Sequence, residues 1–215
     1  MTMTQDRTID SPAINEAFSV PADRAAVDRT AEALRLRGFD VRVADDSAAA
    51  RDAVLALVPE GAEVGQGASI TLDQIGVTAA IEAGGHEAIR PKTRSMDRAT
   101  QMREIRKLGA APDIQLNSVQ AVTEDGQILV VAASGSQLGP ISFGAGRVIL
   151  VVGAQKIVPD LETAFRRVDE YSLPLENVRA RQAYGRNSAV NKLLIMRGDF
   201  PGRTTVVLVR DAVGA

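Results

Sequence analysis

The stretch VGQGASIT, residues 64–71, joins glycines and hydroxyl side chains to the end of an apolar run. If a helix follows, the backbone N–H groups of this turn point at the carboxyl edge of a sheet and can bind an anion. No Gly-Lys-Ser/Thr follows, and Ile70 replaces the third glycine of a dinucleotide fingerprint. A tight turn with Ser69 as a helix N-cap explains the same residues. The candidate ligand-binding residues here are Gly65, Gln66, Gly67, Ser69 and Thr71.

Residues 116–140, LNSVQAVTEDGQILVVAASGSQLGP, place polar side chains after two more apolar runs. Ligands of open α/β sheets bind at such strand exits. Ordinary turn chemistry is the alternative, and it explains residues 123–126 well because Asp125-Gly126 is a common hairpin turn. The candidate ligand-binding residues are Asn117, Ser118, Gln120, Thr123, Gly135, Ser136 and Gln137.

The buried run RVILVVGA, residues 147–154, leads directly to Lys156. This lysine can pair with a phosphate or carboxylate as a point charge. The alternative is an ordinary surface lysine. We expect residues 64–71, 117–126, 134–137 and 153–156 to converge at one edge of the sheet.

The elements that must position these residues alternate along the chain. Hydrophobic spacing predicts helices over 21–37, 46–58, 70–84, 92–109 and 160–171. Strands are expected at 39–43, 62–65, 113–117, after the turn at 124–126, and at 147–154, with KLLIM and TTVVLVR as a C-terminal strand pair. This order predicts an α/β fold with a mostly parallel sheet flanked by helices. We expect a disordered tail at 1–11 and a single domain at 12–215.

Composition excludes several functional classes. The chain has no cysteine and one histidine, His86, so disulfides, thiolate metal sites, a histidine-rich metal site and a Ser-His-Asp triad are not expected. Aromatic residues make up 3% and the net charge is −2, which argues against nucleic-acid binding despite a basic helix near 90–107. With neither a signal peptide nor a membrane-spanning apolar run, a cytoplasmic location is expected.

Three segments together resemble the lactate-utilisation (LUD) domain family: PEGAEVGQGASITLDQIG, DIQLNSVQAVTEDGQIL and RVILVVGAQKIVPDLETAFRRV. The resemblance runs from about residue 20 to the end of the sequence. It implies a fold similar to ribose-5-phosphate isomerase and the CoA transferases. It also implies a link to bacterial L-lactate oxidation alongside Fe–S subunits on other chains. The absence of cysteine agrees with a cluster-free member that holds no cofactor.

The wider superfamily bears on two sites. VGQGASIT looks like the GxGST phosphate loop of ribose-5-phosphate isomerases, which favours the anion-binding interpretation. NSVQAVTEDGQI looks like the GADRITANGD segment of methylthioribose-1-phosphate isomerases, in which the aspartate is catalytic. Gln120 stands at that position here and cannot take up a proton, so Glu124 and Asp125 are the nearby candidate catalytic residues.

Two functions follow. The first is an accessory or ligand-binding subunit in lactate or related 2-hydroxy-acid utilisation, with a small anionic ligand. The second is an isomerase- or transferase-type enzyme for a phosphorylated or CoA-linked metabolite. Either is compatible with a homo-oligomer.

Overall fold

Six strands form the central sheet of the computed structural model, which describes residues 13–215. Their order is β1 (Asp40–Ala44), β10 (Thr204–Val209), β7 (Arg147–Gly153), β4 (Ile114–Ser118), β2 (Glu63–Gln66) and β3 (Glu87–Ala88). All neighbouring pairs run parallel, which confirms the predicted α/β fold with a mostly parallel sheet. The tail expected at 1–11 lies outside the described residues.

A second sheet holds β8 (Ile157–Val158), β5 (Ala121–Thr123), β6 (Ile128–Ala132) and β9 (Lys192–Met196), in that order. Both predicted C-terminal strands therefore form, but they do not pair with each other. β9 runs antiparallel to β6, whereas β10 lies between β1 and β7 in the first sheet. Burial explains the difference, because every residue of β10 is buried while Leu193 and Ile195 of β9 are exposed.

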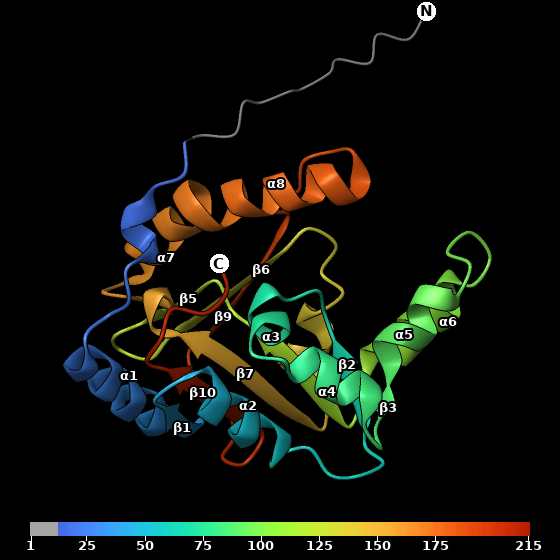
Figure 1. The fold of residues 1–215 in the computed structure, drawn as a ribbon, viewed down its shortest axis with the longest axis horizontal. Helices are drawn as coiled ribbons and strands as arrows, with labels where there is room; N and C mark the ends of the chain where they lie inside the picture. Colours follow the sequence, from blue (N-terminus) through green and yellow to red (C-terminus); the bar gives the residue numbers. More distant parts are fainter. Residues whose placement is uncertain (1–12) are drawn as a thin grey trace, which may run out of the picture.

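Helices cover both faces of the central sheet (Figure 1). Along β7, Val148, Leu150 and Val152 pack in a core with α1 (Arg24–Leu36) and the second sheet. Ile149 and Val151 point to the opposite core, with α2 (Ser47–Leu55), α3 (Ile70–Gln74) and α4 (Val77–Ala83). The helices α7 (Leu161–Arg167) and α8 (Leu173–Tyr184) lie beyond the second sheet, and α7 packs on its outer face.

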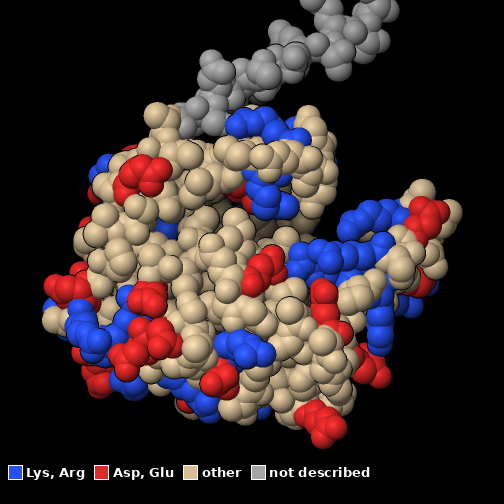
Figure 2. Space-filling view, in the orientation of Figure 1, with Lys and Arg blue, Asp and Glu red and all other residues tan. Residues whose placement is uncertain are grey.

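Two of the predicted helices are interrupted. The helix expected at 70–84 divides at Gly76, which has a φ of 75° that favours glycine. The helix expected at 92–109 is instead α5 (Ile89–Ser95) and α6 (Met102–Ala110), which extend away from the body of the molecule (Figure 1). Basic side chains gather on this extension (Figure 2). Between residues 13 and 215, no helix is long and apolar enough to cross a membrane.

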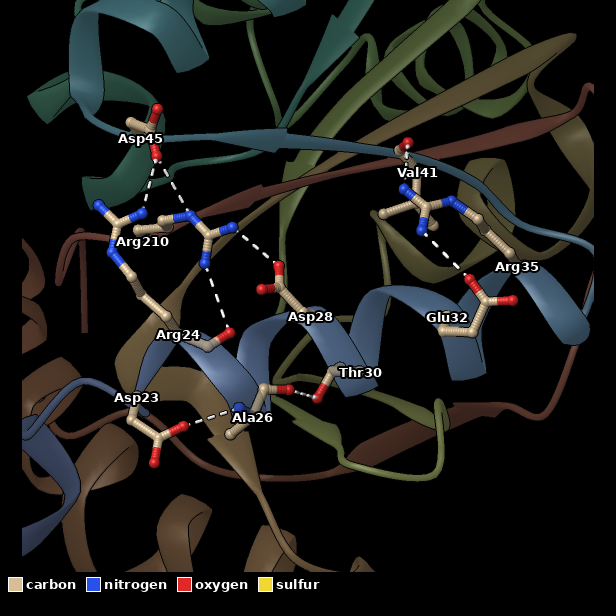
Figure 3. Close-up of polar contacts among 10 residues, drawn as sticks. All are labelled: Asp23, Arg24, Ala26, Asp28, Thr30, Glu32, Arg35, Val41, Asp45 and Arg210. Atoms are coloured by element: carbon tan, nitrogen blue, oxygen red, sulfur yellow. Dashed lines mark hydrogen bonds and ion pairs between the residues drawn. The ribbon is translucent and has the colours of Figure 1, made fainter.

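Ion pairs fix the end of β10 beside α1. Arg210 reaches Asp28 of α1 at 2.8 Å and Asp45, in the loop after β1, at 3.2 Å (Figure 3). Asp23 caps α1 by accepting the Ala26 N–H at 2.7 Å. Arg210 therefore holds the point at which the chain leaves the sheet and enters its last residues, 211–215.

Candidate functional site

Lys156 lies at the carboxyl edge of the central sheet, in a short 3-10 turn (Ala154–Lys156) that follows β7. Its side chain is buried, with a relative exposure of 2% for the residue. The Nζ atom donates to Thr71 Oγ1 and Ser118 Oγ, both at 3.0 Å, and these two oxygens are 3.1 Å apart. Thr71 comes from α3, just after β2, and Ser118 is the last residue of β4. Three strand ends thus meet at one amine, and the surface-lysine interpretation is wrong.

The charge on Lys156 has no counterion among residues 13–215. Its two side-chain partners are neutral hydroxyls, and no carboxylate forms an ion pair with it in that range. Burial, with a smaller contribution from the positive charge of Arg167, lowers the pKa of Lys156 to about 7. At neutral pH the amine is therefore divided between its charged and uncharged forms.

Arg167, at the end of α7, is a second buried cation nearby. Its Nε donates to the Gln155 carbonyl at 3.1 Å, and its Nη1 donates to the Gln120 carbonyl at 2.5 Å and to Ser172 Oγ at 2.9 Å. Its Nη2 is buried and has no hydrogen-bond partner, and its guanidinium lies 5.1 Å from the Tyr171 ring centroid. Burial lowers the pKa of Arg167 to about 10, so it keeps its charge at neutral pH.

Arg167 was not among the predicted site residues, although its position on the helix indicates that it is buried. Ala164, Val168 and Tyr171 are buried, and position 167 lies on their side of the helix by the three- and four-residue spacing. An arginine on an apolar helical face must find buried acceptors. The neighbouring Arg166 is on the solvent side and pairs with Glu170 instead.

Residues 211–215, which we call the cover, lie over the amine. The buried amide of Gln155 holds them: its Nε2 donates to the carbonyls of Val213 at 2.9 Å and Gly214 at 3.1 Å. The Gly214 N–H donates to Gln74 Oε1 at 2.6 Å. A β-carbon at position 214 would overlap Thr71 Oγ1 and come within 3.1 Å of Lys156 Nζ. Only a glycine therefore fits at position 214, where the cover meets the amine.

A cleft of about 450 Å³ lies on the outer side of the cover. Figure 1 shows the C-terminus in the space between α3 and α8. The cleft is lined by both helices and the cover, including Ile70, Gln74, Leu175, Val178, Arg179 and Gly214. Gly214 therefore both lines this cleft and lies close to Lys156 Nζ.

The glycine-rich stretch, residues 64–71, contributes only one residue to the contacts of Lys156. Ser69 caps α3, and its Oγ accepts the Leu72 N–H at 3.3 Å. Gln66 donates to Thr78 Oγ1 at 2.6 Å, and a β-carbon on Gly65 would collide with the side chains of Gln115 and Pro112. Gly67 faces Gln137 and Asn117, whose side-chain oxygens would lie 3.0 and 3.4 Å from a β-carbon there. Of the five predicted residues, Thr71 is the one that contacts Lys156.

The remaining predicted residues divide between the site and the second sheet. Asn117 lies beside Ser118, and its Nδ2 donates to the Ser118 carbonyl at 2.9 Å. Gln120 Oε1 accepts the Val131 N–H at 2.8 Å, which is a structural bond of the second sheet. The exposed Ser136 is 3.1 Å from Ser134 in a turn, and Gly135 faces Lys192.

The candidate catalytic carboxylates are not brought to Lys156. Glu124 pairs with Arg29 at 3.0 Å, and Asp125 pairs with Arg37 at 2.9 Å, so both face α1. Thr123 bonds to Asp125, and its Oγ1 also accepts the Gln127 N–H at 2.8 Å, which is ordinary hairpin chemistry. A hydrogen bond from Thr123 is the main reason that the pKa of the Asp125 carboxyl lies below its usual value. Within the described part of the chain, no cluster of histidines and carboxylates could hold a metal ion.

Comparison with known proteins supplies a family and a fold. The family model of the LUD domain matches residues 27–209. A crystal structure of a DUF162 family protein from Deinococcus radiodurans superposes with a TM-score of 0.55 at 16% identity, covering 88% of this chain and 99% of that one. At this identity the likeness shows the fold. No curated protein matches the sequence.

Proposed function

This chain belongs to the LUD domain family, which is associated with lactate utilisation, and we propose that it binds a small organic anion beside Lys156. In this role it would be a subunit of a protein system that utilises 2-hydroxy acids. One observation carries the proposal: Lys156 is a buried cation at the sheet edge that has only hydroxyl partners. An unpaired buried charge is costly, and a bound carboxylate would offset that cost. The nearby Arg167 adds to the positive potential.

In this proposal, electron transfer belongs to partner chains. A protein-held Fe–S cluster requires cysteine ligands, which this chain lacks. The alternative, an isomerase or transferase that uses Glu124 or Asp125, has less support because both carboxylates pair with arginines of the α1 segment.

Thermal-shift and calorimetric titrations test the proposal with L-lactate, glycolate, inorganic phosphate and ribose 5-phosphate. A ligand at 100 times its Kd should raise stability by about 2.7 kcal/mol. We expect a hydroxy acid to bind, and more tightly at pH 6 than at pH 8, because the amine loses its charge across its pKa of about 7.

Two variants decide whether the binding involves this lysine. Lys156→Met should abolish binding of the hydroxy acid, whereas Lys107→Met, at an exposed position on α6, should bind as the parent does. Equal affinity in the parent and Lys156→Met would overturn the proposal. Preferential binding of ribose 5-phosphate would favour the phosphorylated-metabolite alternative.

A further inference from the structure

Lys156 has the surroundings of a nucleophilic amine. Lysines become nucleophilic when burial or a neighbouring cation favours the uncharged form, which has a free lone pair. Both conditions hold here, because the side chain is buried and the positive charge of Arg167 favours the uncharged form of the amine. A lysine with a purely structural ionic role would pair with a carboxylate of the protein, and none pairs with Lys156 in residues 13–215.

We propose that Lys156 forms a reversible imine with a small carbonyl compound, a 2-oxo acid, at the covered end of the sheet. The acid class rests on the proposed function, since oxidation of a 2-hydroxy acid yields a 2-oxo acid. The nucleophile itself rests on geometry: a buried amine 3.0 Å from each of two hydroxyls, with Gly214 of the cover close to it.

The chemistry balances without an oxidant or a reductant. The lone pair of Nζ attacks the carbonyl carbon, the carbonyl oxygen takes up a proton and the nitrogen gives one up, which leaves a neutral carbinolamine. The hydroxyl of the carbinolamine takes up a second proton and leaves as water as the nitrogen lone pair forms the C=N bond to Lys156. The product is a protonated imine, which becomes neutral when its nitrogen releases the remaining proton. Addition of water reverses both steps.

Thr71 and Ser118 are suited to move these protons. Each hydroxyl can donate and accept, and the two are 3.1 Å apart, so a proton can pass between them as well as to or from Nζ. The imine becomes cationic when protonated, next to the carboxylate that the 2-oxo acid brings with it. We assign Thr71 and Ser118 the role of proton carriers and Lys156 that of the nucleophile.

The ligand would reach the amine from the cleft between α3 and α8. Gly214 lies between this cleft and Nζ, so residues 211–215 must shift before the carbonyl carbon can approach. The cover is held at Gly214 by two side-chain amides, those of Gln155 and Gln74, and by no ion pair among the described residues. Its displacement exchanges these hydrogen bonds for bonds to water or ligand, and it also exposes the buried side chain of Val213.

Reductive trapping tests the imine directly. The full chain is incubated with pyruvate at pH 7.5, treated with borohydride, and examined by intact mass and peptide mapping. We expect one adduct per chain, on Lys156, formed about tenfold or more faster than on the exposed Lys107. Lys156→Arg should give no adduct, Lys107→Arg should give the parent's adduct, and Ser118→Ala should slow trapping. Circular dichroism checks that each variant is folded.

The outcomes separate this inference from the proposed function. L-lactate has no ketone group that could form an imine, so it should give no adduct but should slow trapping by pyruvate. The Gly214→Ala chain, in which we expect the cover to be displaced, is trapped in parallel with the parent. Suppose that pyruvate and lactate stabilise the fold through Lys156 but that neither chain yields an adduct on Lys156. In that case the imine is wrong and anion binding stands. If an adduct forms but lactate neither binds nor competes, the imine stands and the proposed function is wrong.

Discussion

At the scale of single residues, Lys156 combines a stability cost with a chemical use. Its pKa of about 7 lies well below the ordinary 10.5, so between these pH values the folded chain binds fewer protons than the unfolded chain. The free energy of unfolding should therefore rise with pH across this window, and below pH 7 the folded state bears the full cost of the buried charge.

Lys156→Met should remove that cost. One pKa unit corresponds to about 1.4 kcal/mol, so the shift allows a gain of several kcal/mol at most, and we expect about 1–3 kcal/mol at pH 6. The gain should shrink towards pH 10, where the lysine is uncharged in the folded state. Urea unfolding at pH 6, 7.5 and 9 measures it, with Lys107→Met as the control. If Lys156→Met instead lowered the free energy of unfolding by the same amount at every pH, the inference that Lys156 is a costly buried charge would be wrong.

Ser69 tests the two interpretations of the glycine-rich turn. Because its Oγ accepts the Leu72 N–H at the start of α3, Ser69→Ala should lower stability by about 1 kcal/mol. The affinity for a hydroxy acid should stay unchanged, since Ser69 does not contact Lys156. Chemical denaturation and calorimetry on the same variant measure both quantities. A loss of affinity of about 1.5–3 kcal/mol would instead restore the anion cradle at this turn.

At the scale of elements, strand ends assemble the site and the cover closes it. The meeting of Thr71, Ser118 and Lys156 could be predicted from the sequence, because parallel strands bring their carboxyl ends to one edge. The cover could not be predicted. Residues 211–215 have no periodic pattern, and their partners, Gln74 and Gln155, are distant in the sequence.

Gly214→Ala should open the cover. Its φ of 76° is unfavourable for alanine, and the added β-carbon would overlap Thr71 Oγ1. We expect a loss of about 1 kcal/mol or more in stability and faster modification of Lys156 by an amine-acylating reagent. Gly185→Ala is the matched control, since Gly185 has a φ of 68° and no atom within 4 Å of an added β-carbon. Equal labelling of Lys156 in both variants would mean that the cover does not limit access.

At the scale of the whole molecule, the layers follow from sequence patterns but the strand order does not. The apolar run of β7 indicates a strand buried on both faces, as found. The run of β10 is similar, yet its proximity to β9 in the chain predicts that the two strands pair with each other. Nothing local specifies that β10 inserts between β1 and β7, because both partner strands are distant from β10 in the sequence.

This central position of β10 predicts that the fold forms as one cooperative unit. A chain ending at Gly202 lacks β10, and with it the burial of Val206, Val207, Leu208 and Val209. Each such side chain contributes about 1.5–3 kcal/mol when buried, so the loss is comparable with the roughly 5–15 kcal/mol that stabilises a whole domain. The loss also leaves the edges of β1 and β7 unpaired.

We therefore expect the chain ending at Gly202 to show no cooperative thermal transition by circular dichroism. The control is a chain that ends at Arg210, which keeps β10 and the ion pairs to Asp28 and Asp45 but lacks the cover. It should unfold cooperatively at a lower temperature than the full chain, because it loses the buried Val213. A cooperative transition in the shorter chain would show instead that β1 and the remaining strands form a stable unit before β10 is added.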